Sequence, residues 1–212
     1  MPEPFESPPT GLPAEAARPR RRVGVLISGS GSNCMALIAA ARAADYPAEI
    51  ALVVSNRPDA PGLAKAAAAG VATLAIDHKP FGKDREAHER AIQAALEAAG
   101  VQFVALAGYM RVFTPWFIGK WSGRMINIHP SLLPAFPGLH PHQQALDAGV
   151  TEAGCSVHWV TEGVDQGAVI GRAVVPVLPG DDEASLAARV LAEEHRLYPA
   201  CLAKAVKTSS AR

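Results

Sequence analysis

The sequence has few cysteines, no net charge and no long apolar run, and each of these shortages excludes a class of protein. Its three cysteines, Cys34, Cys155 and Cys201, lie far apart without the spacing of a metal knuckle, which predicts buried thiols in a reducing compartment. Its 20 basic and 20 acidic residues cancel, so no large charged surface is offered to nucleic acid or anionic lipid. No window approaches the roughly 20 apolar residues that cross a bilayer, and no apolar signal core is present. We therefore expect a cytoplasmic protein with small-molecule partners, no nucleic acid and no membrane.

Length and composition limit the number of domains. A chain of 212 residues, 49% of them hydrophobic, can bury one substantial core. Residues 1–21 are rich in proline, mix both charges and show no apolar period, so they cannot offset the entropy of becoming ordered. We predict a disordered N-terminal tail over 1–21 and a single folded domain over 22–207, in a monomer or a homodimer.

Apolar runs alternate with alanine-rich helical segments from residue 22 onward, which is the pattern of βαβ units and a parallel sheet. Near the end, two apolar runs joined by a short turn predict an antiparallel hairpin. The predicted fold class is α/β, with a mostly parallel central sheet, an added antiparallel hairpin and helices on both faces. The expected strands are 23–27, 49–54, 71–76, 101–107, 125–129, 155–161 and 168–177, and the expected helices are 32–44, 61–70, 84–99 and 183–206.

A glycine-rich turn, ISGSGSN at 27–33, connects the first strand to the first helix. Glycines at such a turn let backbone N–H groups approach an anion at the positive end of the helix dipole, and a side chain there would block that approach. A dinucleotide site would need a third glycine where Cys34 stands and an acidic residue where Asn56 stands. The turn therefore predicts a cup for a single phosphate, with an ordinary tight turn as the alternative. The predicted phosphate-binding residues are Gly31, Ser32 and Asn33.

Polar side chains appear where a buried strand ends. Asn127 and His129 are two apart, so they point the same way from the strand, toward the crevice in which ligands of parallel sheets bind. A stiff loop with four prolines follows over 130–141. Asp165, in the turn of the hairpin, can approach the imidazole and favour its charged form. The alternatives are a buried histidine satisfied by the backbone and a solvated aspartate in a turn.

Three further histidines raise the question of a metal. They are His140, His142 and His158, and His140 and His142 with Asp165 could supply the imidazole and carboxylate ligands of a transition metal. A proline between the first two histidines and the lack of a helical HExxH pair make this geometry awkward. We expect no metal, and a metal-dependent hydrolase using His140 and His142 is kept as an alternative.

Six ordered motifs resemble one family, the folate-dependent phosphoribosylglycinamide formyltransferases. They are ISGSGSN, SNRPDAPGLAKA, LAGYMRVF, NIHPSLLPAFPGLHPHQQAL, SVHWVTEGVDQG and EEHRLYP, and the resemblance runs from Val23 to the last helix. It implies a Rossmann-like formyltransferase fold over 22–207. It also implies transfer of the formyl group of 10-formyltetrahydrofolate to the amine of N1-(5-phospho-ribosyl)glycinamide in de novo purine biosynthesis, by direct attack through a tetrahedral intermediate.

The resemblance also assigns roles to individual residues. Asn127 and protonated His129 would bind the oxyanion, while Asp165 would hold the imidazole and help the amine to lose its proton. Glu194 would contact the ribonucleotide, and Arg85 would meet the glutamate tail of the folate. The residues implied in folate binding are Arg85, Met110, Arg111, Val112, Phe113, Asn127, Thr161, Glu162, Gly163 and Val164.

Other functions remain as alternatives. Methionyl-tRNA formyltransferases and formyltetrahydrofolate hydrolases share the Asn-x-His and Ser-Leu-Leu-Pro elements, but we expect neither the extra RNA-binding domain of the first nor the regulatory domain of the second. A formyltetrahydrofolate hydrolase or another folate-dependent formyltransferase of this fold is therefore the nearest alternative. A nucleotide-binding regulatory module without catalysis is a further one, although mere binding does not need the Asn127 and His129 pair.

Overall fold

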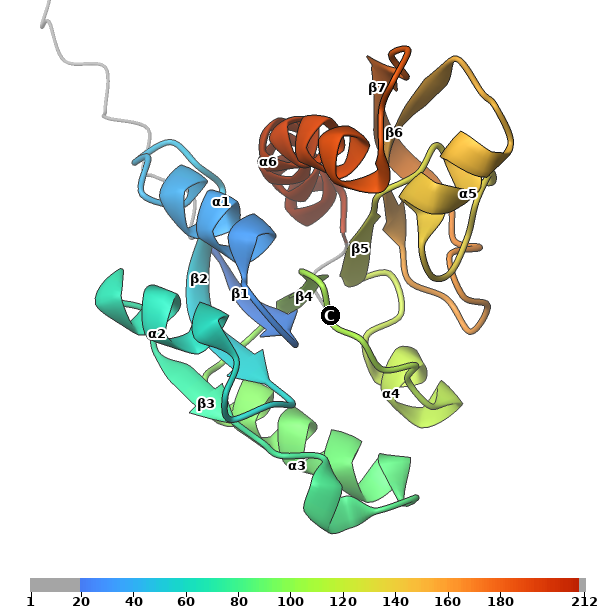
Figure 1. Cartoon of the computed structure of the whole chain (residues 1–212). Coiled ribbons are helices and arrows are strands. Elements are labelled where there is room, and N and C mark those ends of the chain that lie inside the picture. The colour runs from blue at the N-terminus through green and yellow to red at the C-terminus, as the bar shows by residue number, and fades with distance from the viewer. Residues whose placement is uncertain (1–19, 210–212) are drawn as a thin grey trace, which may run out of the picture.

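A seven-stranded sheet runs through the part of the chain that the computed structural model describes, residues 20–209. Its strand order is β3-β2-β1-β4-β5-β6-β7 (Figure 1). The first five strands pair in parallel, β6 runs antiparallel to β5, and β7 runs antiparallel to β6. This confirms the predicted α/β class and the antiparallel addition to the sheet. The strands are β1 (Arg21–Ile27), β2 (Ala48–Ser55), β3 (Thr73–Ala75), β4 (Phe103–Leu106), β5 (Met125–His129), β6 (Glu152–Trp159) and β7 (Val169–Pro176).

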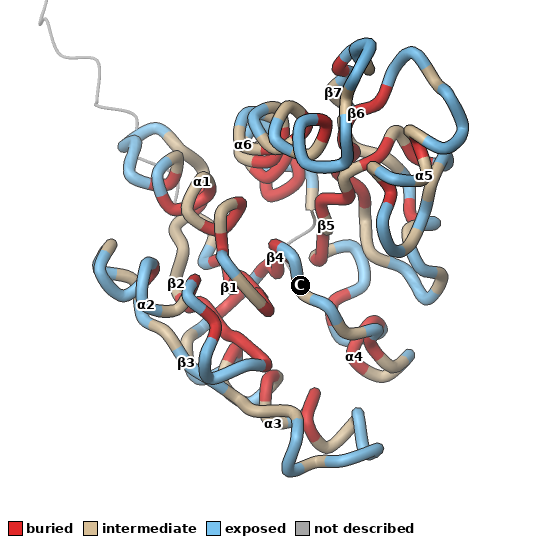
Figure 2. Tube along the Cα trace, in the orientation of Figure 1, coloured by how far each residue is buried: buried red, intermediate tan, exposed pale blue. Residues whose placement is uncertain are grey.

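Helices cover both faces of the sheet, as predicted. The side chains of β1 alternate between the faces: Val23, Val25 and Ile27 pack with α1, α2 and α6, whereas Leu26 packs with α3 and α4. Figure 2 shows buried residues gathered along the central strands. The helices are α1 (Ser32–Ala40), α2 (Pro61–Ala68), α3 (Arg85–Ala98), α4 (Pro115–Lys120), α5 (Pro141–Asp147) and α6 (Glu183–Thr208), with a 3-10 turn η1 (Lys79–Phe81).

Local signals mark some of the helix ends. The Asp84 side chain accepts a hydrogen bond from the Ala87 N–H at 2.9 Å and starts α3, and Asp182 forms a capping box with Ser185 at the start of α6. Gly100, with φ of 62°, follows the end of α3 as predicted. The helix expected at 32–44 ends earlier, at Ala40, and no helix was expected where α4 and α5 form. No helix within residues 20–209 is long and apolar enough to cross a membrane.

The start of the described chain bears on the predicted tail. Strand β1 begins at Arg21, and residue Arg21 pairs with Ala48 of β2, so this end of the predicted tail belongs to the sheet. Residues 1–19, which form the rest of that tail, lie outside the described residues.

The strand order places a crevice at the carboxyl ends of the strands. From β1 the chain builds β2 and β3 on one side of the sheet, and then crosses to build β4 and β5 on the other. Loops that leave the carboxyl ends of β1 and β4 therefore diverge, which is the general position of ligand sites in open α/β sheets.

Candidate active site

Two adjoining cavities occupy this crevice. The glycine-loop pocket, of about 510 Å³, is formed by residues 28–33 together with side chains that follow β2 and β3. The histidine pocket, of about 440 Å³, is formed by the ends of β4, β5 and β6 and the loops beside them. Both pockets are lined by Asn33, Gly108, Met110 and Arg111, so one ligand can extend from one pocket into the other.

The glycine loop presents the amino end of α1 to its pocket. Gly31 is the N-cap residue, with φ of 71° and ψ of 24°, and no side chain caps the helix. The first N–H groups of α1 are therefore available to a ligand, as an anion site requires. Ser32 is the first residue of the helix, as predicted, and Gly31 stands at the cap position.

Asn33 and Glu194 join α1 to α6 at the boundary between the pockets. The Asn33 Nδ2 group donates to Glu194 Oε2 at 2.8 Å, and both side chains are buried. Burial raises the pKa of Glu194, and the Asn33 hydrogen bond opposes this only in part. Asn33 Oδ1 is also buried and has no hydrogen-bond partner among the described residues. One N–H of Asn33, which was predicted to bind the phosphate, is therefore already bonded to Glu194.

Ser28 connects the walls of the two pockets. Its hydroxyl donates to Asn56 Oδ1 at 2.6 Å and accepts a hydrogen bond from the Met110 N–H at 2.8 Å. One buried side chain at the end of β1 therefore fixes both the end of β2 and the loop after β4.

Asn127 lies opposite His158 in the antiparallel pair of β5 and β6. The Asn127 Nδ2 atom is 3.2 Å from His158 Nε2, and His158 Nδ1 is 2.9 Å from the Trp159 carbonyl oxygen. Because a carbonyl only accepts, Nδ1 carries a proton, and Nε2 can accept from the Asn127 amide with that amide oriented as placed. The second Asn127 N–H then remains for a ligand.

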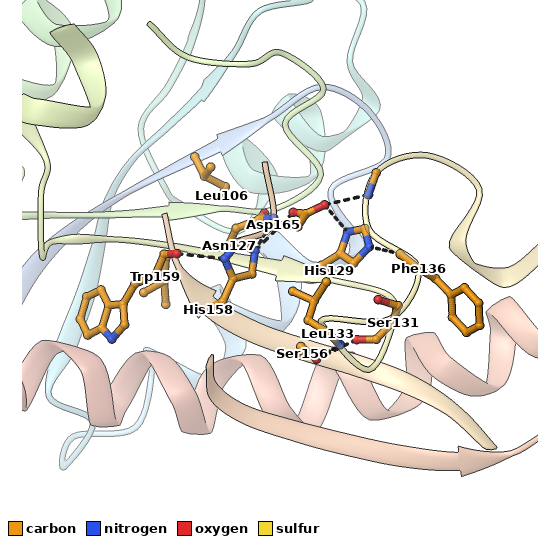
Figure 3. A network of polar contacts seen from close by, with 12 residues as sticks. Leu106, Asn127, His129, Ser131, Leu133, Phe136, Ser156, His158, Trp159 and Asp165 are labelled. Atoms are coloured by element: carbon orange, nitrogen blue, oxygen red, sulfur yellow. Dashed lines mark hydrogen bonds and ion pairs between the residues drawn. The ribbon is translucent and has the colours of Figure 1, made fainter. Parts of the chain in front are cut away.

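His129 is held between two acceptors. Its Nδ1 atom is 3.4 Å from Asp165 Oδ2, and its Nε2 atom is 3.0 Å from the Phe136 carbonyl oxygen (Figure 3). A carboxylate and a carbonyl both need a donor, so a doubly protonated ring satisfies the two contacts together. The geometry is therefore suited to a charged imidazole that donates from Nε2.

Asp165 lies between the two imidazole rings (Figure 3). It has φ of 55°, and its Oδ2 atom accepts from the Gly138 N–H at 2.9 Å. Strand β6 ends beside Ile126, so the following turn folds back over the sheet to bring Asp165 to the far end of β5.

The pKa of Asp165 reflects opposing effects. Burial tends to raise it, but hydrogen bonds and the charge of His129 lower it below the ordinary value. The His158 Nε2 atom is 3.5 Å from Asp165 Oδ1, and it cannot donate there while it accepts from Asn127. We therefore attribute the lowered pKa to the Gly138 N–H and His129.

Residues 21–202 match the model of the family described as formyl transferase. The chain belongs to the formyl transferase family. Phosphoribosylglycinamide formyltransferase of Escherichia coli (strain K12) is 46% identical over 175 residues, which cover 82% of this chain and 82% of that protein. A crystal structure of phosphoribosylglycinamide formyltransferase from Brucella melitensis has 56% identity and a TM-score of 0.84, covering 88% of this chain and 95% of that one.

A longer relative shows the same similarity over part of its length. The trifunctional purine biosynthetic protein adenosine-3 of Drosophila pseudoobscura pseudoobscura is 52% identical over 189 residues, which are 88% of this chain and 14% of that protein. The chain thus spans about a seventh of this relative and most of the bacterial ones. Within the formyl transferase family, it groups with the phosphoribosylglycinamide formyltransferases.

Most of the predicted formyltransferase site residues come together. Asn127, His129, Asp165 and Glu194 line the histidine pocket, and Gly31 and Ser32 line the glycine-loop pocket. Arg85 does not join them: it is exposed on the first turn of α3 and lines neither pocket. The other predicted folate residues that line the histidine pocket are Met110, Arg111, Val112, Phe113, Thr161, Glu162, Gly163 and Val164.

The histidines considered for a metal are placed differently from one another. His140 is exposed at the rim of the histidine pocket, 3.7 Å from Glu183 Oε1, whereas His142 does not line that pocket. His158, weighed in the sequence only as a metal ligand, instead contacts Asn127 and Asp165. Within residues 20–209 no group of three or more His, Cys, Asp and Glu side chains is placed to hold a metal ion.

Ser28 and His158 are among the residues of the site that were not predicted as part of it. A signal for His158 was present, because an imidazole interrupts the apolar strand CSVHWV opposite a second strand that carries Asn127. The sequence held no signal for Ser28 beyond its place after β1, since its role depends on a hydrogen bond from Met110, which is 82 residues away.

Proposed function

We propose that the chain transfers the formyl group of 10-formyltetrahydrofolate to the amine of glycinamide ribonucleotide, as a step of de novo purine biosynthesis. The observation that carries this proposal is the pocket wall formed by Asn127, His129 and Asp165, directly beside a glycine loop suited to one phosphate. A formyl donor in the histidine pocket and a phosphate at the glycine loop would place the substrate amine near Asn127 and His129. The names of the bacterial relatives describe formyl transfer to phosphoribosylglycinamide, which supports the proposed acceptor.

The proposed reaction needs hydrogen-bond donors more than it needs a base. The amine nitrogen attacks the formyl carbon, the carbonyl oxygen becomes an oxyanion, and the bond from carbon to the folate nitrogen then breaks. The free N–H of Asn127 and the Nε2–H of His129 stabilise the oxyanion. For His129 to do so, its Nε2–H exchanges the Phe136 carbonyl for the formyl oxygen.

Asp165 mainly maintains the charge of the His129 ring in this proposal. Its lowered pKa makes it a weak base, so it accepts the amine proton, through water, only after the carbon–nitrogen bond has formed. That proton ends on the departing folate nitrogen, which balances the reaction. Asp165 and the imidazolium of His129 thereby return to their starting charges.

The folate residues complete the proposal. The backbone of 110–113 and of 161–164 would hold the pterin in the histidine pocket. Arg85, which lines neither pocket, would meet the glutamate tail of the folate outside them. Glu194 would contact the ribonucleotide. A cytoplasmic location, a monomer or homodimer, and no metal remain predictions of the sequence.

An assay of formyl transfer to glycinamide ribonucleotide, with 10-formyltetrahydrofolate and a chelator present, tests the proposal. We expect formylated ribonucleotide and deformylated folate in equal amounts. Formate released without formylated ribonucleotide would indicate the hydrolase instead. Loss of activity in the chelator, together with inactive His140→Ala and His142→Ala variants, would indicate the metal-dependent hydrolase.

A further inference from the structure

We propose that Gly62, at the start of α2, is a positioning residue that holds the glycine loop in the shape that binds the substrate phosphate. This inference rests on the proposed function, because it takes a phosphate group to be the occupant of the glycine-loop pocket. No residue of α2 lines that pocket in the described chain, so any effect of Gly62 on binding passes through the loop.

The two backbones touch at a pair of glycines. A Cβ added at Gly62 would lie 3.0 Å from the Gly31 Cα and 2.6 Å from Ile27 Cδ1, and a Cβ added at Gly31 would lie 2.8 Å from the Gly62 Cα. At Gly62 the contact below 3.0 Å is with the end of the Ile27 side chain, which can shift, but the Gly31 Cα and the Gly29 carbonyl oxygen, both at 3.0 Å, are backbone atoms that would have to give way by a few tenths of an ångström. Only glycine at both positions allows α2 to approach the loop so closely.

Hydrogen bonds fix the direction of the loop peptides at this contact. The Gly62 N–H donates to the Gly29 carbonyl at 3.0 Å, and Lys65 Nζ donates to the Ser30 carbonyl at 3.0 Å. In a planar trans peptide the N–H points opposite to the carbonyl. With both carbonyls turned toward α2, the N–H groups of Ser30 and Gly31 point away from it, on the side where these residues line the pocket.

This arrangement prepares the loop before a ligand arrives. A free glycine-rich loop would lose backbone freedom when it binds phosphate, and the contact with α2 removes much of that freedom beforehand. The N–H groups of the loop and the amino end of α1 are then aimed at one anion together. Displacing the loop should weaken binding of the ribonucleotide without touching the groups that carry out the transfer.

The test compares Gly62→Ala with Gly119→Ala. Gly119 lies in α4, is exposed, and has nothing within 4 Å of an added Cβ, so it is a matched glycine-to-alanine control. For Gly62→Ala we expect the KM for glycinamide ribonucleotide to rise roughly tenfold, with kcat and the KM for the formyl folate changed by less than about twofold. Gly119→Ala should keep all three constants.

Lys65→Met is the second variant in case Gly62→Ala fails to fold. Lys65 is exposed, so its loss should spare folding and raise the KM for the ribonucleotide about two- to threefold. The inference would be overturned if the KM for the ribonucleotide stayed unchanged in whichever of these variants folds. It would also be overturned if kcat fell and both KM values rose by similar factors. Either result would leave the proposed function intact. If the wild type transfers no formyl group, the proposed function fails instead. The affinity for inorganic phosphate then decides the inference, because the wild type should bind phosphate more tightly than the Gly62→Ala variant does.

Discussion

The two pockets offer a ligand different chemical groups. The glycine-loop pocket offers backbone N–H groups from a loop whose shape is fixed by glycines and by a neighbouring helix. The histidine pocket offers polar side chains from β5, from β6 and from the turn after β6. Each is oriented by a neighbouring group: Asn127 by His158, and His129 by Asp165 and the Phe136 carbonyl. A pocket of backbone groups is sensitive to added atoms, whereas a pocket of side chains is sensitive to removed ones. The predictions below test this difference, because substitutions on the two sides should change different kinetic constants.

The largest effect is expected in the histidine pocket. Removing the donors with His129→Ala or Asn127→Ala should lower kcat by roughly a hundredfold or more, since one oxyanion donor is commonly worth about 3 kcal/mol. The KM for the ribonucleotide should change little, because its phosphate is bound elsewhere. Single-turnover rates at saturating substrates would measure this. A fully active His129→Ala enzyme would contradict both the mechanism and the contrast between the pockets.

Asp165→Asn should have the next largest effect, a loss of roughly tenfold or more in kcat, because the charged His129 ring loses its counter-charge. Its effect on stability should depend on pH. A carboxyl whose pKa is lowered in the fold stabilises the protein above its ordinary pKa, about 4, and this stability is lost as the pH falls through the lowered value. The difference between wild type and variant in denaturant unfolding should therefore be largest at pH 7 and shrink as the pH falls below about 4. An equal difference across this range would be evidence against this account.

Glu194→Gln tests the boundary between the pockets and should have a smaller effect. The glutamine oxygen can still accept from Asn33, so we expect a rise of only a few-fold in the KM for the ribonucleotide. Burial raises the pKa of Glu194, and a raised carboxyl pKa makes the fold less stable as the pH rises through it. Glu194→Gln should therefore melt above wild type at pH 8 and together with it at pH 4. A variant that melts below wild type at pH 8 would show that the Glu194 charge is stabilising.

Deletion of residues 1–19 should have the smallest effect and serves as the reference for the others. The deletion keeps Arg20, whose guanidinium donates to the Ala48 carbonyl at 3.1 Å. Because the deleted segment lacks an apolar period, we expect kcat, both KM values and the melting temperature to stay unchanged. A fall of several degrees in the melting temperature would show that the segment packs on the domain.

Periodicity along the chain predicted the sheet, the hairpin and the four longer helices, because these patterns are local. The two short helices escaped it, since six or seven residues of α4 and α5 hold fewer than two turns and start at Pro115 and Pro141 rather than at a polar cap. The pairing of Asn127 with His129 was also predicted, because two residues apart on a strand means one face.

The rest of the site depends on register and on contacts between distant segments. His158 meets Asn127 only through the register of β5 and β6. The role of Gly31 was predicted in part: a side chain there was expected to obstruct the ligand, but its Cβ would first strike Gly62. No pattern in the sequence reveals that contact, because the two glycines lie in separate motifs. The Phe136 carbonyl at His129 is equally invisible, since every residue has a carbonyl and only the fold selects one.

The wall shared by the two pockets has a thermodynamic consequence. Gly108, Met110 and Arg111 line both cavities, and the Met110 N–H is tied to Ser28 at the end of β1. A ligand in either pocket therefore lies against residues that also line the other pocket. Whatever factor the ribonucleotide applies to the affinity for the folate, the folate must apply to the affinity for the ribonucleotide, since the two routes to the ternary complex have the same total free energy. Titrating each ligand with and without the other would give one coupling free energy measured twice, and Ser28→Ala should shift both values by the same amount.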